Sequence, residues 1–158
     1  MARSRPSARP VAVGAVVALA AVLSGCSATN PITTEEPYSA SDGVRATLGS
    51  VTAENLLVIA AEADGPGAVQ GALTNRGDEP VTVDLVLGGD SEQLRLGAGE
   101  TVLLGGTEGE ELVLTTPAAP GAVADVTLRT AADGEIGFQV PVLDGTLPEY
   151  ADLVPSEA

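Results

Sequence analysis

Histidine, lysine and tryptophan are absent from the 158 residues, and cysteine occurs once, at Cys26. Without histidine no Ser-His or Cys-His nucleophilic pair can form, and without lysine a Ser-Lys dyad is excluded as well. Zinc sites built from histidine and cysteine are excluded by the same counts. A single cysteine makes no intramolecular disulfide, so an exported domain of this chain must be held by its core alone.

Aromatic residues are almost as scarce, with Phe138, Tyr38 and Tyr150 as the whole set. A glycosidase needs two carboxylates in a cleft, and such clefts are usually rimmed by aromatic rings that this chain lacks. The core is therefore aliphatic. At about 1.5–3 kcal/mol per fully buried Val, Leu or Ile, many small side chains must share its stabilisation.

Positive charge is scarce and unevenly placed: the net charge is −15, and three of the seven arginines are Arg3, Arg5 and Arg9. After Cys26, four arginines stand against 22 carboxylates, a charge of −18. Such a surface repels nucleic acid and anionic lipid headgroups. We therefore expect no nucleic-acid partner.

The N-terminus has the form of a secretory signal peptide. The three arginines precede an apolar run from Val11 to Leu23, which is shorter than the roughly 20 residues that span a bilayer. Small residues follow before Cys26, as at a signal-peptidase site. We predict a signal peptide over residues 1–25; no adjacent arginine pair supports the twin-arginine route.

Leu23-Ser24-Gly25-Cys26 resembles the lipobox of bacterial lipoproteins. The resemblance implies diacylglycerol on the Cys26 thiol and cleavage between Gly25 and Cys26. Two C16-length acyl chains give on the order of 20 kcal/mol of gross partitioning energy, enough to hold the protein on the extracytoplasmic face of the cell membrane. The alternative is a secreted protein whose cysteine lies near its start by chance.

The rest of the chain divides by composition into a linker, a patterned domain and a tail. Residues 26–41 have little periodicity and predict a flexible linker, and residues 42–143 alternate short apolar runs with turn residues. Residues 144–158 form an acidic tail in which Tyr150 and Leu153 could pack back onto the domain.

The apolar runs predict an all-β fold. Val81–Leu87 is the clearest, with alternate residues apolar, and no segment shows a sustained helical period. Asp133-Gly134 predicts a type I′ hairpin turn, and Pro141 predicts an edge strand or a strand end. Eight or nine strands at this spacing favour an antiparallel immunoglobulin- or cupredoxin-like β-sandwich. The predicted strands are 44–48, 55–61, 69–74, 81–87, 94–96, 101–104, 112–114, 122–129 and 136–142.

Two features could carry binding chemistry. Carboxylates cluster at Glu108, Glu110 and Glu111 and again at Asp90 and Glu92, and calcium prefers such oxygen ligands. Solvated loops on an acidic protein explain the same clusters.

The second feature is Arg76-Gly77-Asp78, which spells an integrin-binding tripeptide. The same residues suit a hairpin turn, in which glycine would supply a positive φ. We favour the turn.

Several motifs resemble those of a group of actinobacterial lipoproteins: Asp42-Gly43-Val44, Leu48-Gly49, Asn55–Val58, and a segment from Pro66 to Val81. That group is distantly similar to the periplasmic copper chaperones called PCuAC, which have a cupredoxin-like β-sandwich and bind Cu(I) with histidine and methionine. The resemblance implies the fold. It carries over no copper ligand, because histidine is absent and the one methionine, Met1, precedes the predicted cleavage.

The sequence therefore predicts a non-enzymatic, lipid-anchored β-sandwich that acts as an accessory or interaction module for a protein of the cell envelope. No cofactor is expected. The alternative is a metal or small-ligand binder of copper-chaperone-like descent that uses carboxylates.

Overall fold

The computed structural model describes residues 41–156, which lie within one compact unit, Tyr38–Ala158. The predicted signal peptide, Cys26 and all of the linker except Ser41 fall outside the described residues. In the described part, no helix has both the length and the apolar character needed to cross a membrane.

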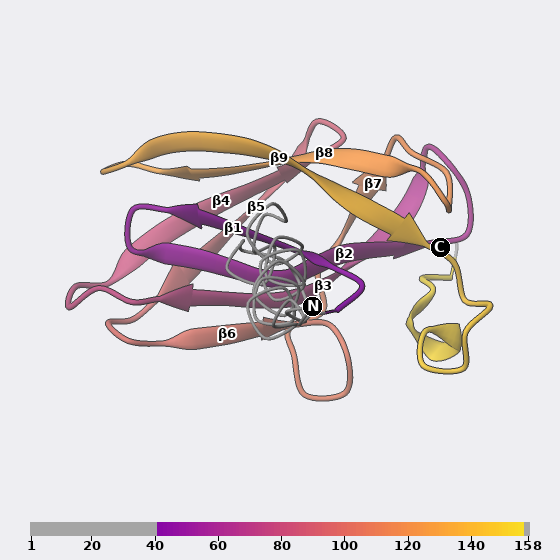
Figure 1. The fold of residues 1–158 in the computed structure, drawn as a ribbon, viewed down its shortest axis with the longest axis horizontal. Helices are drawn as coiled ribbons and strands as arrows, with labels where there is room; N and C mark the ends of the chain where they lie inside the picture. Colours follow the sequence, from indigo (N-terminus) through magenta and orange to yellow (C-terminus); the bar gives the residue numbers. More distant parts are fainter. Residues whose placement is uncertain (1–40, 157–158) are drawn as a thin grey trace, which may run out of the picture. The chain divides into compact units, whose positions relative to one another are not determined.

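Nine strands and one short 3₁₀ turn make up the described chain (Figure 1), which confirms the all-β prediction. The predicted bounds of 44–48, 81–87 and 101–104 are those of β1, β4 and β6. The elements are β1 (Val44–Leu48), β2 (Val51–Ala60), β3 (Gly65–Asn75), β4 (Val81–Leu87), β5 (Asp90–Leu96), β6 (Thr101–Leu104), β7 (Val113–Thr116), β8 (Val123–Thr130), β9 (Gly134–Leu143) and η2 (Ala151–Leu153).

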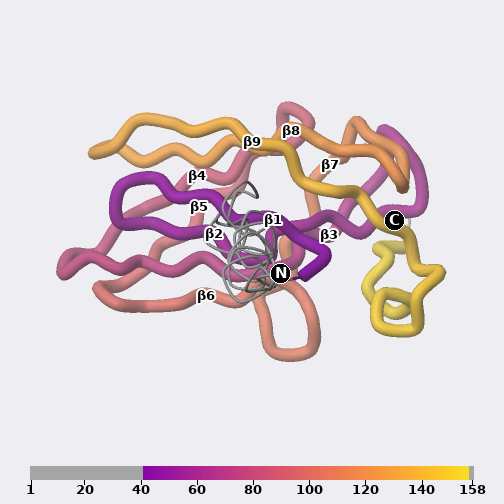
Figure 2. Tube along the Cα trace, viewed as in Figure 1, coloured from indigo at the N-terminus to yellow at the C-terminus, as the bar shows by residue number. Residues whose placement is uncertain are grey.

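The strands form one mixed sheet that nearly closes into a barrel, and the predicted antiparallel sandwich is not confirmed. The order is β5-β4-β8-β9-β2-β3-β6, with β1 on β2 and β7 on β3, as the chain trace in Figure 2 allows the reader to follow. β9 pairs with β2 in parallel, Val58 opposite Val142, and this pairing joins the two halves. Alternating hydrophobicity sets which face of a strand is buried, but it does not set the direction of the strand's neighbour.

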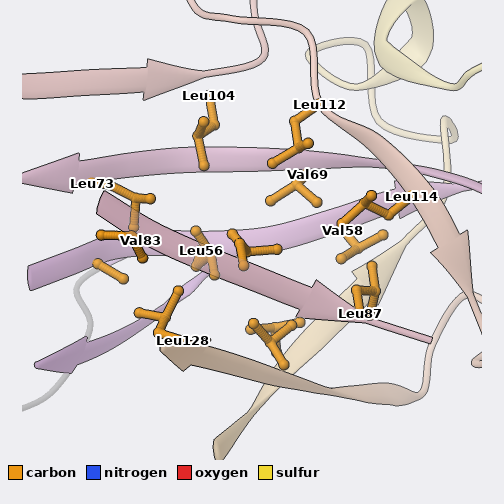
Figure 3. Close-up of a cluster of buried hydrophobic side chains, with 14 of the residues drawn as sticks. Leu56, Val58, Val69, Leu73, Val83, Leu87, Leu104, Leu112, Leu114 and Leu128 are labelled. Atoms are coloured by element: carbon orange, nitrogen blue, oxygen red, sulfur yellow. The ribbon is translucent and has the colours of Figure 1, made fainter. Parts of the chain in front are cut away.

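The core is aliphatic, as the sequence predicts. β4 buries Val83, Leu85 and Leu87 completely on one face. In Figure 3, Leu112 lies next to Val69 of β3. The side chains from both halves of the sheet thus form a single cluster.

A β-bulge in β2 brings together the glycines of the sequence motifs. Asn55 has a positive φ of 53°, and the β2–β3 register shifts between Glu54 and Leu57. The Oδ1 atom of Asn55 accepts a hydrogen bond from the backbone N–H of Gly43 at 2.9 Å. A Cβ on Gly71 would lie 2.8 Å from the carbonyl oxygen of Asn55, so the backbones of β2 and β3 approach too closely there for any side chain.

Of two glycine-containing hairpin turns, the one between β8 and β9 differs from the expectation. Gly88 and Gly89, both with positive φ, join β4 to β5 in a two-residue turn typical of type I′. Between β8 and β9 only Gly134 has a positive φ, and Thr130 pairs with Gly134 across three loop residues. That loop is therefore the type I turn with a bulge, and the predicted type I′ turn at Asp133-Gly134 is wrong.

Pro141 lies two residues before the end of β9 and not on an edge strand. Val142 bonds toward β8, donating to the carbonyl of Ala122 and accepting from Gly121. The nitrogen of Pro141 therefore faces the other side, where β9 meets β2 only at Val142 and Leu143. Proline costs no ladder hydrogen bond at this point.

The tail returns to the start of the described chain. After β9, the segment that carries η2 curls beyond the strand ends (Figures 1 and 2). The hydroxyl of Tyr150 donates to Oδ2 of Asp42 at 2.6 Å. Leu153 is half-buried and lines a hollow together with Ala68 and Gly105.

Candidate functional site

The barrel is incomplete where its two ends face each other. Among residues 41–156, β5 pairs with β4 alone, while the other end of the order is formed by β6 and β7 on β3. We call the gap between β5 and residues 110–115 the seam. At its outer end the backbone N–H of Thr115 donates to Oδ2 of Asp90 at 3.0 Å, a side-chain contact across the gap.

Two hollows lie along the seam. The first, of about 430 Å³, is lined from β5 by residues 92–95, and from the other wall by residues 110–113. The second, of about 650 Å³, lies between Asp90 and the start of β3 and includes Glu62 and Asp64. Val113, 39% exposed, lines both, so an apolar side chain stands at the middle of an acidic surface.

The structure brings the two predicted carboxylate clusters to this one place. Glu92 and Asp90 lie on β5, and Glu110 and Glu111 line the opposite wall of the first hollow. Glu108 lines neither hollow. Within residues 41–156 no three His, Cys, Asp or Glu side chains are grouped so as to hold a metal ion.

Nothing in the sequence pattern indicates that Glu62 and Asp64 join the site. They sit in the β2–β3 turn, where Asp64 has a positive φ of 59° and donates its N–H to the carbonyl of Thr116 at 2.8 Å. That bond holds the turn against the end of β7. An Asp between two Gly- and Ala-containing runs is a turn signal, but nothing in it indicates which strand the turn will face.

Hydrogen bonds from the hydroxyl and backbone N–H of Thr115 lower the pKa of Asp90 below its usual 3.8. Asp90 therefore stays ionised at any pH near neutrality, beside the carboxylates of Glu62 and Asp64. The hydrogen bonds from Thr115 thus favour the charged form of Asp90 at this end of the seam.

Arg95 is the cation of the seam. Three of the four described arginines pair with carboxylates: Arg45 and Arg76 with Glu54, and Arg129 with Glu135. Arg95 has no such pair among the described residues, although Glu92 lines the same hollow.

Arg76-Gly77-Asp78 lies in the turn between β3 and β4, as predicted. The turn is held by buried Asn75, whose Oδ1 accepts from the N–H of Gly77 and whose Nδ2 donates to the carbonyls of Glu79 and Gly97. The expected positive φ at Gly77 is wrong.

The fold is similar to solved PCuAC domains. The apo PCuAC domain of PmoF2 has a TM-score of 0.50 and 14% identity, over 66% of this chain and 98% of that chain. The copper-bound PCuAC domain of PmoF2 scores 0.49 at 17% identity over 64% and 98%, and the apo PCuAC domain of PmoF1 scores 0.48 at 20% over 63% and 98%.

At these identities the likeness concerns the fold, and it confirms the distant similarity to PCuAC domains that the motifs implied. The chain matches no protein-family profile and no curated protein sequence.

Proposed function

We propose that this chain is a lipid-anchored, extracytoplasmic lipoprotein whose β domain is a non-enzymatic binding module for a protein of the cell envelope. The seam carries the proposal. It leaves a strand edge unpaired, holds fixed negative charge, and exposes Val113 at its centre. An unpaired strand edge presents free backbone groups to which another chain can add a strand.

Copper transport in the manner of the PCuAC domains is not part of the proposal. Cu(I) prefers soft ligands, and the chain has neither a histidine nor a methionine after Met1. A carboxylate site for calcium remains the alternative, and a calcium-dependent rise in melting temperature would favour it over a protein partner.

Anchoring rests on the lipobox resemblance at Cys26. The acidic domain would be repelled by anionic headgroups, so the acyl chains would supply the whole membrane affinity. Cys26→Ser in the full chain should move the protein from the membrane fraction to the soluble fraction. Ser24→Ala keeps a small residue at that position and should leave the protein membrane-bound. Membrane retention and normal cleavage of Cys26→Ser would overturn the anchoring proposal.

The binding role is tested by site-specific photo-crosslinking in intact cells. A photo-reactive phenylalanine analogue at Val113 should give discrete adducts with an envelope protein. The same analogue at Val123, 53% exposed on β8 and outside the seam, is the matched control. Adducts of equal yield from both positions, or from neither, would contradict a partner at the seam.

A further inference from the structure

The open edge of β5 presents a definite set of backbone groups. The N–H of Val142 donates to the carbonyl of Ala122 at 3.0 Å, which fixes the phase of the β8–β9 ladder. In antiparallel ladders, hydrogen-bonded pairs alternate with non-hydrogen-bonded pairs. Because the β8–β4 and β4–β5 registers are unbroken, the bond at Val142 determines which residues of β5 form hydrogen bonds with β4. The backbone N–H and C=O groups of Ser91, Gln93 and Arg95 are thereby directed away from β4, into the seam.

The two-residue turn at Gly88-Gly89 gives the same answer independently. Such a turn closes on a hydrogen-bonded pair, here Leu87 and Asp90, so Asp90 bonds to β4 and Ser91 does not. Ser91, Gln93 and Arg95 therefore direct their backbone groups away from β4. This length of free edge is enough to pair with a short added strand.

The side chains beside this edge favour a guest strand that carries positive charge. Glu92 pairs with buried Leu85 and so lies on the core-facing side of β5, where it lines the first hollow with Glu110 and Glu111. An inward-facing charge at an edge prevents pairing with an ordinary apolar strand. A guest strand that brings a lysine or arginine into the hollow meets three carboxylates and one cation, Arg95, so the charge of the lining remains negative.

The same charges exclude the other occupants. A second copy of this acidic domain would bring its own carboxylates to the seam, and like charges across an interface are costly. The chain's own segment before residue 41 carries Glu35 and Glu36 and no cation after Arg9. A cationic segment from another protein is the occupant that the electrostatics favour.

We infer that β5 is a docking edge for an extended, lysine- or arginine-bearing segment of a partner protein, which adds as a strand along Ser91–Arg95 and places a basic side chain in the hollow lined by Glu92, Glu110 and Glu111. The inference rests on the proposed binding role and specifies its partner. Backbone pairing supplies the affinity, and the carboxylates supply the selectivity.

Three probes separate strand addition from simple charge attraction. The first is an eight-residue peptide of alternating threonine and lysine, the second replaces lysine by glutamate, and the third is spermine, which carries positive charge without a peptide backbone. With the purified full chain, saturating lysine peptide should slow amide hydrogen exchange at residues 91, 93 and 95 about tenfold, and leave 92 and 94 unchanged. The glutamate peptide should not bind, and spermine should not protect these amides.

Two sets of variants test the two halves of the inference. Gln93→Pro removes an N–H that β4 does not use and should abolish peptide binding without changing weak spermine binding, whereas Gln93→Ala should bind the peptide normally. Neutralising Glu92, Glu110 and Glu111 to glutamine should weaken the lysine peptide about tenfold or more. Neutralising Asp78, Glu79 and Glu149 changes the net charge equally, away from the seam, and should leave affinity within about twofold.

Unaltered exchange at residues 91, 93 and 95 under saturating lysine peptide would overturn the inference, as would equal binding of the two peptides. Because that readout uses the wild-type chain, it stands even if Gln93→Pro fails to fold. Crosslinks from Val113 to a partner, combined with no protection of β5, would retain the proposed binding role and remove strand addition. Protection of β5 without any crosslink from Val113 in cells would show that the edge can add a peptide strand, but it would contradict the binding role and, with it, the inferred partner.

Discussion

Asp90 and Thr115 fasten one end of the seam: the backbone N–H of Thr115 donates to Oδ2 of Asp90 at 3.0 Å, from β7 to β5. A side chain thus bridges two strand ends that do not pair through their backbones. We expect Asp90→Ala to speed amide exchange at Thr115 while Glu92→Ala leaves it unchanged. Equal exchange at Thr115 in both variants would show that the bond does not hold the two strands.

The same bond has a pH dependence. The folded-state pKa of Asp90 is lowered, so its stabilising contribution is complete above the ordinary value of 3.8 and is lost as the pH falls through the lowered value. The amide resonance of Thr115 should therefore shift with a midpoint below pH 3.8. A midpoint at or above 3.8 would contradict the assignment.

Thr116 offers a stabilising substitution. Its side chain is fully buried, and its hydroxyl oxygen has no hydrogen-bond partner among the described residues. Thr116→Val removes the unsatisfied group at similar shape and should raise the free energy of unfolding by about 1 kcal/mol. Thr130→Val is the control, because the Thr130 hydroxyl accepts from the N–H of Asp133 at 3.0 Å, and its loss should cost about 1 kcal/mol. Denaturant unfolding measures the free energy of unfolding of both variants. A lower value for Thr116→Val than for the wild type would contradict the prediction.

Gly71 should be intolerant of substitution. Its φ is 135°, and a Cβ there would lie 2.8 Å from the carbonyl oxygens of Glu54 and Asn55. Gly71→Ala should destabilise the fold by about 1–3 kcal/mol, since backbone atoms have to move. Gly137→Ala in β9 has its nearest contact at 3.8 Å and should be close to neutral. Thermal unfolding of the pair tests this, and equal melting temperatures would count against the close approach of β2 and β3.

Tyr150 should ionise late. Its hydrogen bond to Asp42 raises its pKa to about 12, with desolvation adding to the effect. The raised value means that the stabilising contribution is complete below pH 10.0 and is lost as the pH rises through 12. Tyrosinate absorbance of the wild type minus that of Tyr150→Phe isolates this residue from Tyr38. Asp42→Ala should bring the midpoint back toward 10.0, and a wild-type midpoint already near 10.0 would refute the contact.

The sequence predicted the strands best where alternation is uninterrupted. β1 and β4 have the predicted bounds because apolar residues alternate along one face of each, and β6 has them as a short apolar run. β2 begins earlier than predicted, at Val51, because the positive φ of Asn55 interrupts the pattern at the bulge. The first half of β5, Asp90–Gln93, was missed because it is exposed on both faces and shows no alternation.

The site was less predictable than the strands. The carboxylates of Asp90 and Glu92 and those of Glu110 and Glu111 were visible as two local clusters. Their meeting at one seam depends on which strands lie at the two ends of the sheet. The alternation of apolar and polar residues along a strand does not determine the order of the strands. The parallel β2–β9 pairing was unpredictable for the same reason.

That parallel pairing also sets the order in which the chain can fold. The β2–β3 and β4–β5 hairpins are local, and a chain synthesised from its N-terminus can form them early. The wall between β2 and β9 has to wait until Leu143 is available. Until then β2, mostly apolar and buried on both faces in the finished domain, has an open flank. A chain truncated before β9 is therefore expected to be an aggregation-prone fragment and not a smaller domain.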